Sequence, residues 1–414
     1  MEETLRKLMI AASALAGIAA LPAHAQTSVV LYGLIDQGFA YTSNVQTGRT
    51  GGALKGKQQY ALSDGAAGIG GSRWGLKGTE DLGGGYQAIF TLENGFNINT
   101  GGLAQGGLMF GRQAFVGLAA PVGRLTFGRQ YSIGADMLAP FSEAGEIPIH
   151  MGANPGDFDD LGHSFRLNNT IKFRSTDFHG VTLGGMYSVG GLAGAPGRNQ
   201  IWSLAATYAM GPFSAGVGYT NARDPNLSYF GTNGNAGGSN TDNMGTIGTT
   251  ATSVQTNPIY SGFASANTLQ LLIAGTKYRL GSLTVGGTYT HASYDGLGDT
   301  TAGPNPARYS GTAIINNGEV NVSYIFTPAF SVNASYGYTR KASVGSFGEA
   351  TYNQGTLAAS YLLSKRTQLY AFAIYQKASG TDSLGQPAVA SITQLTASSN
   401  NKQLLIRVGI VHTF

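Results

Sequence analysis

The stretch LLIRVGIVHTF, Leu404 to Phe414, has the period-two alternation of a β-strand. Every second residue from Leu404 to Phe414 shares one face, and His412 is the one polar residue on that face. Arg407, Gly409 and Thr413 lie on the opposite face. Ends of chains are usually loose polar tails, because a terminus must be tied down to stay ordered. A strand that runs to an aromatic residue therefore indicates pairing with another strand.

The same alternation recurs along the chain, with apolar or aromatic residues on one face and small or polar residues on the other. It is clearest in residues 86–93, 202–210, 213–220, 319–326 and 330–339. In each of these segments the second face is too polar and too small to form a packed core. The apolar faces therefore need an apolar environment outside the protein.

The connections between these segments are of two kinds. Seven are short: 80–85, 119–123, 175–180, 210–212, 280–282, 327–329 and 363–366. Eight are long and rich in Gly, Asn, Ser and Thr: 43–70, 99–106, 132–163, 190–199, 222–267, 295–316, 343–350 and 379–401. Together they join sixteen strands. This pattern predicts an all-β fold, a 16-stranded antiparallel transmembrane β-barrel with short periplasmic turns and long extracellular loops.

Closure of the barrel follows from the physics of the bilayer. In hydrocarbon every backbone N–H and C=O must be paired within the protein, so the sheet has to close on itself. We therefore expect the strand that ends at Phe414 to pair with the first one, residues 28–42. A soluble sandwich would also show alternation, but it would not explain why the turns are short on one side alone.

Composition excludes several classes of function. The chain has a net charge of +4 with no basic run, which argues against nucleic-acid binding. It contains no cysteine, so disulfides, thiol catalysis and thiolate metal sites are excluded. After the N-terminal region no segment approaches ~18 consecutive apolar residues, which excludes transmembrane helices.

Residues 1–25 have the pattern of a cleaved export signal. Arg6 and Lys7 precede the apolar run Leu8 to Leu21, and Ala23-His24-Ala25 forms a small-x-small cleavage site. The acidic pair Glu2-Glu3 departs from this pattern and suggests a start codon assigned too early. We expect a signal peptide at 1–25 and a single barrel domain at 26–414.

No catalytic, cofactor or metal motif stands out, so we expect no enzyme activity and no cofactor. The sequence has neither HExxH nor GxSxG. The five histidines after residue 25 are interpreted as loop, turn or girdle residues: His150, His163, His179, His291 and His412. The run Asp157 to Asp160 offers oxygen ligands for calcium but lacks the spacing of a calcium loop, which favours a solvated acidic loop.

Four segments carry a resemblance to a known family: SRWGLKGTEDLGGGYQAIFTLENGF (72–96), FGRQAFVGL (110–118), GRLTFGRQY (123–131) and NNTIKF (168–173). They resemble Gram-negative trimeric general porins, in particular the β-proteobacterial branch. The resemblance implies a homotrimer in the outer membrane, in contact with lipid and lipopolysaccharide. It also implies that Phe414 is read by the barrel assembly machinery. Gly117 and Gly128, expected on outward faces, would favour close packing between barrels.

The resemblance further implies that the third long loop, 132–163, folds into the barrel and faces a wall of basic residues. The implied acids are Asp136 and Glu143, and the implied basic residues are Arg73, Arg112 and Arg174. Strand alternation supports an inward Arg73 and places Lys172 on the same face as Arg174. Alternation would turn Arg112 and Arg129 outward, so the motif alone places Arg112 inside, and Arg129 is the weaker candidate. Inward Asp36 departs from the family pattern and would soften an anion preference.

These features favour a general diffusion porin that passes ions and small hydrophilic solutes with a weak preference for anions. A substrate-specific channel is the alternative within the same class, and it would need binding residues that the sequence does not reveal. An adhesin or receptor barrel is the alternative from another class. It would use the long loops 222–267 and 379–401 as its binding surface.

Overall fold

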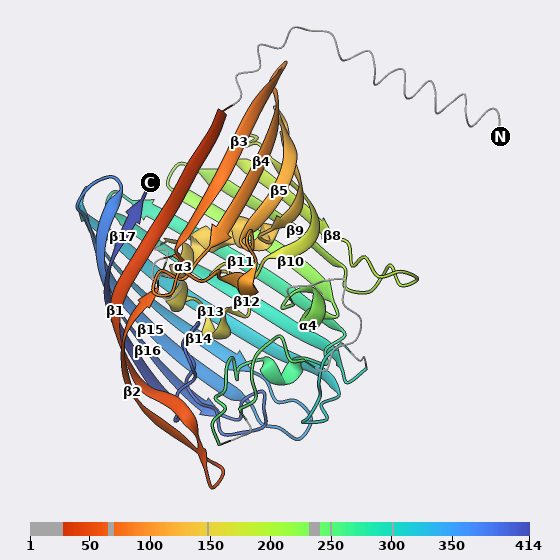
Figure 1. The fold of residues 1–414 in the computed structure, drawn as a ribbon, viewed down its shortest axis with the longest axis vertical. Coiled ribbons are helices and arrows are strands. Elements are labelled where there is room, and N and C mark those ends of the chain that lie inside the picture. The colour runs from red at the N-terminus through yellow and green to blue at the C-terminus, as the bar shows by residue number, and fades with distance from the viewer. Residues whose placement is uncertain (1–27, 65–69, 147–148, 232–240, 249–250, 300–301) are drawn as a thin grey trace, which may run out of the picture.

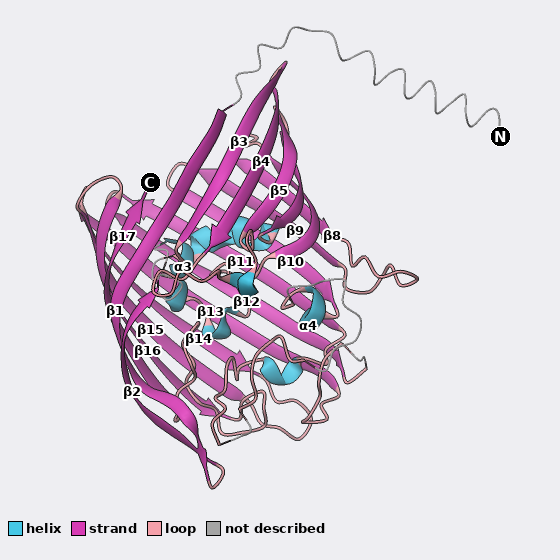
Figure 2. Cartoon of the chain, viewed as in Figure 1, coloured by secondary structure: helices cyan, strands magenta, loops and turns pink. Residues whose placement is uncertain are grey.

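The computed structural model describes residues 28–64, 70–146, 149–231, 241–248, 251–299 and 302–414. The expected export signal lies outside these residues. The described residues form seventeen strands in one antiparallel sheet that curves into a barrel (Figures 1 and 2). The strands are β1 Ser28–Thr50, β2 Ala53–Asp64, β3 Arg73–Gly83, β4 Tyr86–Gly95, β5 Gln113–Ala120, β6 Gly123–Gln130, β7 Leu167–Ser175, β8 Val181–Ser188, β9 Ile201–Met210, β10 Phe213–Arg223, β11 Thr268–Leu280, β12 Leu283–Leu297, β13 Gly311–Thr327, β14 Phe330–Lys341, β15 Ala350–Leu362, β16 Thr367–Gly380 and β17 Lys402–Thr413.

The seventeen strands occupy sixteen positions in the barrel, because β2 and β3 share one position. Residues 28–34 of β1 pair with β3, and residues 37–50 of β1 pair with β2. The second barrel strand is therefore formed by β2 and β3 together, and it is interrupted at the described residues 70–72, which are not in a strand. The predicted sixteen-stranded barrel is confirmed.

The prediction of a long loop at 43–70 was wrong for residues 43–64, which form a strand hairpin, and residues 65–69 lie outside the described part of the chain. β1 continues to Thr50, turns at Gly51 and Gly52, and returns as β2, which forms a hairpin that extends beyond the other strands (Figure 1). Residues 43–60 carry little apolar alternation because this part of the hairpin has no apolar face to bury. The periodicity that reveals a membrane-facing strand is therefore absent there.

The barrel closes between β1 and β17, as expected. The register runs from Leu34 opposite Thr413 to Thr42 opposite Leu405. Phe414 extends the seam, since its N–H and C=O each form a 3.1 Å hydrogen bond with the backbone of Gly33. A side chain at Gly33 would overlap the Phe414 ring, so the glycine makes room for the aromatic residue at the seam.

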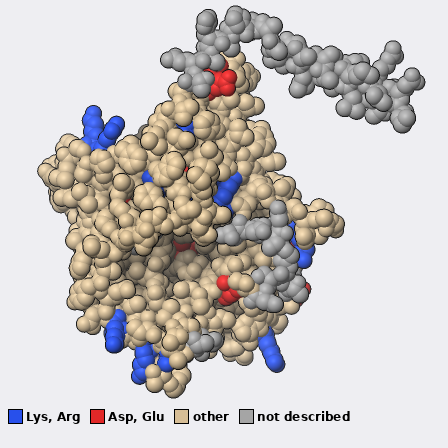
Figure 3. Space-filling view, in the orientation of Figure 1, with Lys and Arg blue, Asp and Glu red and all other residues tan. Residues whose placement is uncertain are grey.

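All seven short connections fall between consecutive strands, and they gather at one end of the barrel while the long loops gather at the other (Figure 1). The outward faces are apolar: Leu204 is 59% exposed, Val320 60% and Val408 51%. Most of the visible surface is accordingly uncharged (Figure 3). Among the described residues, no helix has the length and apolar character to cross a membrane.

The prediction that Gly117 and Gly128 face outward was wrong. Val116 and Leu118 are the exposed residues of β5, so Gly117 between them faces the lumen. Exposed Phe127 likewise turns Gly128 inward, and Gly128 has a φ of +136° at a β-bulge in β6. Large apolar side chains occupy the lipid side in both strands.

The segment between β6 and β7, residues 131–166 and here called loop 3, folds into the lumen as expected (Figure 2). It contains α2 Ile133–Leu138, η3 Ala139–Phe141, α3 Glu143–Glu146, η4 His150–Gly152 and η5 Pro155–Asp157. Its apolar side packs on the inner faces of β8, β10 and β11, where the wall residues are glycines. A Cβ at Gly275 would lie 2.6 Å from the Phe141 side chain, and one at Gly216 would lie 2.9 Å from Leu138.

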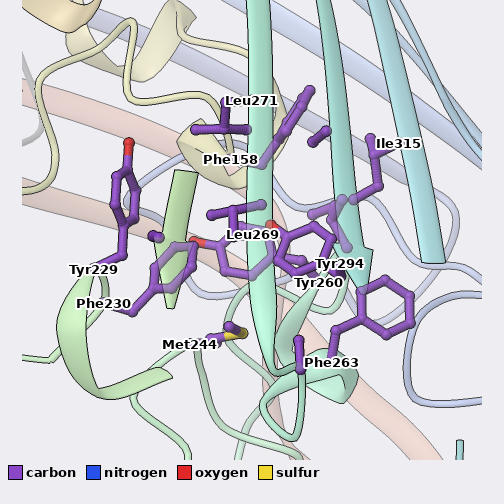
Figure 4. Packing of buried hydrophobic residues seen from close by; sticks show 14 of the residues in the cluster. Phe158, Tyr229, Phe230, Met244, Tyr260, Phe263, Leu269, Leu271, Tyr294 and Ile315 are labelled. Atoms are coloured by element: carbon purple, nitrogen blue, oxygen red, sulfur yellow. The ribbon is translucent and has the colours of Figure 1, made fainter. Parts of the chain in front are cut away.

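Two other long loops fold inward as well: residues 224–267, here loop 5, and 381–401, here loop 8. Loop 5 carries α4 Pro225–Ser228 and η6 Ser261–Phe263, and its described aromatic residues pack against Phe158 of loop 3 and the walls of β11 and β12 (Figure 4). The Tyr260 hydroxyl donates to the Gly156 carbonyl at 2.9 Å. From loop 8, the Thr393 hydroxyl donates to the Asn154 carbonyl at 2.9 Å. The described parts of both loops therefore narrow the lumen from the long-loop end.

Candidate functional site

Loop 3 leaves a polar passage between itself and the wall formed by β3 to β7. The narrow part of this passage is lined by Arg73, Glu93, Arg112, Gln113, Tyr131, Asp136, His150 and His163. A larger cavity on the side of loops 5 and 8 shares Arg112, His150 and His163 with it and adds Arg166, Ser72 and residues 393–396. The shared residues show that the two spaces adjoin, and we call the narrow part the constriction.

Glu93 of β4 is the centre of the basic wall. It accepts a 2.7 Å hydrogen bond from Arg112 Nε and a 2.9 Å bond from the Tyr32 hydroxyl, and Arg73 Nε lies 4.0 Å away. The second Arg112 contact is a 2.8 Å hydrogen bond to the Tyr131 hydroxyl. One carboxylate thus holds two arginines side by side on the wall, and it offsets one of their two charges.

Arg112 lies inside the barrel although alternation would turn it outward. β5 begins at Gln113, so Arg112 occupies a bend before the strand and is not bound by the strand's alternation. The family motif was therefore a better guide to its position than periodicity. Arg73 is the first residue of β3, on the inward face that alternation predicts.

Asp136 of α2 faces this wall from loop 3. Its carboxylate lies 2.6 Å from Lys172 Nζ and 3.8 Å from His163 Nε2. Burial alone would raise the pKa of Asp136, but Lys172 and His163 outweigh burial and lower the pKa below its usual value. Lys172 also donates to the Tyr131 carbonyl at 3.0 Å, so one side chain on β7 ties the start of loop 3 to the wall.

Arg166 and two histidines join the site, and the sequence did not single them out for it. Arg166 donates to the Tyr131 hydroxyl at 2.9 Å, and its guanidinium lies 4.7 Å from the centre of the Tyr131 ring. Its position where loop 3 rejoins the wall, two residues before the NNTIKF motif, is the signal that could have found it. His150 and His163 are loop residues as interpreted, but both line the constriction. Burial and then repulsion from His163 and the arginines lower the pKa of His150 well below its usual value, so this imidazole is neutral at neutral pH.

Three residues proposed for the constriction lie elsewhere. Arg174 is exposed on β7, two residues beyond Lys172 toward the short turn after Ser175. Arg129 sits at the β6 bulge, where it donates to the Gly111 carbonyl at 2.9 Å and contacts Asn168. Glu143 of loop 3 is buried against the wall of β13, where its backbone N–H donates to Glu319 at 2.6 Å.

Asp36 was expected on the open lumen wall, and the structure buries it instead. Its side chain is 0% exposed and forms an ion pair with Arg407 of β17 at 3.5 Å. Alternation correctly turned Asp36 inward, but it does not show that a second inward residue on a neighbouring strand covers the carboxylate. Arg407 precedes the terminal residues by only a few positions and was read from sequence as an inward residue without a role.

The prediction that the acidic run Asp157 to Asp160 is solvated was wrong. Asp157, Asp159 and Asp160 are all buried and point to different partners. Asp157 accepts hydrogen bonds from the backbone N–H groups of Gly162 and Ser164, and Asp159 accepts from Thr290 of β12 at 2.7 Å. Burial is the main cause that raises the pKa of Asp159 to about 6. Within the described part of the chain, no group of three or more His, Asp or Glu residues is arranged to hold a metal ion.

Comparison with known proteins gives this geometry a family. The family described as Gram-negative porin matches residues 11–381. An outer membrane porin protein of Bordetella pertussis is 31% identical over 391 residues, which cover 90% of this chain and 94% of that protein. The outer membrane porin protein 32 of Delftia acidovorans is 34% identical over 52% of this chain and 59% of its own length.

Solved structures agree on the fold. An anion-selective porin from Comamonas acidovorans has a TM-score of 0.68 at 21% identity and covers 94% of this chain and 100% of its own. A trimer form of OmpT, an outer membrane protein of Vibrio cholerae, has a TM-score of 0.60 at 15% identity and covers 94% of this chain and 99% of its own. With a family match over most of its length and a closed sixteen-stranded barrel around an inward-folded loop, the chain belongs to the Gram-negative porins, a family of outer-membrane channels.

Proposed function

We propose that this chain is a general diffusion porin that passes ions and small hydrophilic solutes down their gradients with a weak preference for anions. The observation that carries the preference is the charge balance at the constriction. Arg73, Arg112, Arg166 and Lys172 stand against the carboxylates of Glu93 and Asp136. The cations exceed the carboxylates by two, and water-filled pores with such an excess favour anions.

The preference is expected to be modest. A unit charge acts on an ion about 10 Å away with roughly 0.4 kcal/mol in a water-like dielectric. Two excess charges therefore contribute on the order of 1 kcal/mol, and salt screens part of that. This favours a several-fold preference in dilute salt and little preference in concentrated salt.

The remaining features of the proposal concern export and assembly. We infer that residues 1–25 are a cleaved signal peptide, that the barrel assembles as a homotrimer in contact with lipid and lipopolysaccharide, and that Phe414 serves the assembly machinery as a recognition residue. The structural support is the place of Phe414 at the closing seam against Gly33. The trimer is supported by the family and by the trimer form of the Vibrio cholerae neighbour.

An adhesin or receptor barrel finds no support in the described loops. Loops 5 and 8 direct their aromatic and apolar residues into the lumen, against loop 3, so these side chains are not displayed to a partner outside. Their inward packing instead suits a channel with a restricted cross-section.

Planar-bilayer recording of the purified protein tests the proposal. We expect stepwise conductance with closures in groups of three, and a reversal potential in a salt gradient that shifts toward the anion equilibrium potential. The shift should shrink as the total salt concentration rises. Absence of conductance from folded protein would reject the channel proposal, and a cation-directed reversal potential would reject the anion preference.

A further inference from the structure

The interruption of the second barrel strand lies at the constriction. β2 ends at Asp64 and β3 begins at Arg73. Ser72 lines the larger cavity, and Arg73 lines the constriction itself. A Cβ built at Gly70 would lie 3.6 Å from the Arg73 guanidinium and 3.8 Å from His150. The end of the interruption that leads into β3 therefore lies close to the Arg73 side chain.

A buried polar cluster stands beside the interruption. Asp36 of β1 and Arg407 of β17 are both 0% exposed, and their charged groups lie 3.5 Å apart. The Tyr370 hydroxyl of β16 joins them: it donates to Asp36 Oδ1 at 2.6 Å and accepts from Arg407 Nε at 2.8 Å. The three residues come from β1, β17 and β16, which are paired side by side, so three neighbouring strands of the wall hold the cluster.

Each charge of this pair holds one end of the interruption. Arg407 donates to the hydroxyl and, at 2.9 Å, to the carbonyl of Ser63, just before the break. The Asp36 carboxylate accepts from the Gly70 backbone N–H at 3.3 Å, three residues before β3 begins. The backbone of Asp36 also exchanges two hydrogen bonds with the Ser72 hydroxyl, at 3.2 and 3.3 Å. Ser72 is the residue directly before Arg73.

The barrel accommodates this cluster with a glycine at position 38 and at the energetic cost of burying two charges. A Cβ at Gly38 would come within 2.9 Å of the Arg407 guanidinium, so only glycine leaves space for the arginine across the seam. Removing two charges from water is expensive, and an apolar pair of the same volume would close a barrel at least as well. In some proteins a buried ion pair contributes by fixing one particular arrangement rather than by adding stability.

We propose that Asp36 and Arg407 are positioning residues that fix the strand interruption and thereby hold Arg73 in the constriction. Neither residue touches a passing ion, and both act on selectivity through the place of Arg73. This inference deepens the proposed function, on which its selectivity test rests. A positioning role and a direct role of Asp36 as a pore-lining carboxylate predict opposite changes in anion preference when Asp36 is neutralised.

That difference in sign gives the first test. Asp36→Asn removes a negative charge, so a pore acid would raise the anion preference when neutralised. A positioning residue would lower it, because Arg73 is released. We expect Arg73→Gln to lower the anion-to-cation permeability ratio in dilute salt by about twofold, and Asp36→Asn to lower it in the same direction by up to that amount, because a displaced Arg73 acts less strongly on a passing ion. The double variant should show no further fall, and a rise or an unchanged ratio for Asp36→Asn would overturn the proposal.

A neutral variant covers the case in which Asp36→Asn does not assemble. Ser72→Ala deletes only the hydroxyl that ties the Asp36 backbone to the residue before Arg73, and it changes no charge. It should lower the permeability ratio in the same direction. Ser331→Ala is the matched control, since it removes a comparable 2.9 Å side-chain hydrogen bond, to Ser360, on the far wall. Equal ratios for Ser72→Ala and Ser331→Ala would contradict the proposal.

A cysteine reporter tests the position of residue 73 without reference to selectivity. The chain has no cysteine, so Arg73→Cys provides a single thiol for a charged methanethiosulfonate reagent. Adding Asp36→Asn or Ser72→Ala should change its modification rate at least about threefold, because thiol reactivity follows exposure and local charge. Unchanged rates would overturn the positioning role. If the modification rates change but the pore shows no anion preference, only the proposed anion selectivity is rejected and the positioning role stands.

Discussion

The two halves of the lumen differ in what fills them: one is packed with side chains and the other is polar and open. On the side of β8 to β13, loops 3 and 5 fill the space with buried side chains such as Phe141 and Tyr260, and glycines on β10 and β11 let loop 3 approach the wall. On the side of β3 to β7 the wall carries Arg73, Arg112 and Lys172, and loop 3 turns Asp136 toward them. One half is packed like a protein core, and the other stays polar and open.

The difference teaches that loop 3 works as a partition. Its apolar side needs a dry wall, which glycines on β10 and β11 provide by letting Leu138 and Phe141 approach the backbone. With that side fixed, the polar side is held at a defined distance from the arginines. The selectivity of the charged half therefore depends on packing in the other half.

The largest expected effect concerns the seam on which both halves depend. Deleting Phe414 removes two backbone hydrogen bonds to Gly33 and the ring that covers it, so β1 and β17 lose the end of their pairing. We expect synthesis and export to continue while folded barrel is lost. Heat-modifiability of the band on SDS gels measures this.

His412→Ala is the control for the deletion, because it changes the same strand and leaves the backbone pairing of Phe414 in place. Normal amounts of heat-modifiable protein from the truncated chain would show that the seam closes without its terminal residue. Failure of both variants would show that the strand, and not Phe414, is what matters.

The second prediction breaks the packed half alone. Gly275→Ala would place a Cβ 2.6 Å from the Phe141 side chain, so the tip of η3 has to move away from β11. Overpacking of this kind costs on the order of 1–3 kcal/mol. We expect a lower unfolding temperature together with altered single-channel conductance, as the partition shifts.

Gly337→Ala is the matched control, because this inward glycine of β14 has its nearest neighbours 3.8 Å from the new Cβ and should accept it without movement. Conductance and unfolding temperature of Gly337→Ala should equal those of the parent protein. If Gly275→Ala also equals the parent in both, the glycine wall does not hold loop 3.

Apolar alternation and the family motif predicted different parts of these two halves, and the packing between them left no local pattern in the sequence. The strands of both halves were predicted, because lipid imposes apolar alternation wherever a strand spans the bilayer. The family motif added Arg73, Arg112, Lys172 and Asp136, which the structure brings to one place. The packed half stayed hidden, because the glycines and loop residues that meet there are far apart in sequence and follow no period.

The failures share a physical cause. Arg166 and His150 reach the constriction through tertiary folding of loop 3, which no local pattern encodes. Glu93 lies on β4, and its role depends on Arg73 and Arg112, which come from other parts of the chain. Asp36 was placed on the correct face, yet burial by Arg407 across the seam changed what it does. The acidic run in loop 3 looked solvated because its composition is polar, while each carboxylate instead accepts hydrogen bonds that fix the loop.

The third prediction acts on the charged half alone. Changing Arg73 and Arg112 together to Glu reverses two charges at the constriction and leaves the packed half untouched. The effect on a passing ion is on the order of 1–2 kcal/mol in dilute salt. The reversal potential in a salt gradient should swing from the anion side to the cation side, with conductance only moderately changed.

Arg174→Glu serves as the comparison for this double variant, since Arg174 is exposed on β7 away from the constriction. It should move the reversal potential much less. If the double variant keeps the parent reversal potential in dilute salt, or if Arg174→Glu moves it as far, then charge at the constriction does not set selectivity.

The smallest expected effect is a pH dependence of stability that arises where loop 3 contacts β12. Asp159 fixes loop 3 to Thr290 of β12, and burial, with a further contribution from Asp157, raises its pKa to about 6. A carboxyl whose pKa is higher in the folded protein stabilises it while protonated, and this stabilisation is lost as pH rises from the unfolded value, 3.8, through about 6. Between pH 5 and pH 8 the loss is on the order of 1 kcal/mol.

Asp159→Asn keeps an acceptor for Thr290 without the titration, so its unfolding temperature should change less over this range than that of the parent protein. Asp81→Asn, at the exposed end of β3, should leave the pH dependence as it is. An unaltered dependence in Asp159→Asn would show that this carboxyl does not set the pH dependence of stability.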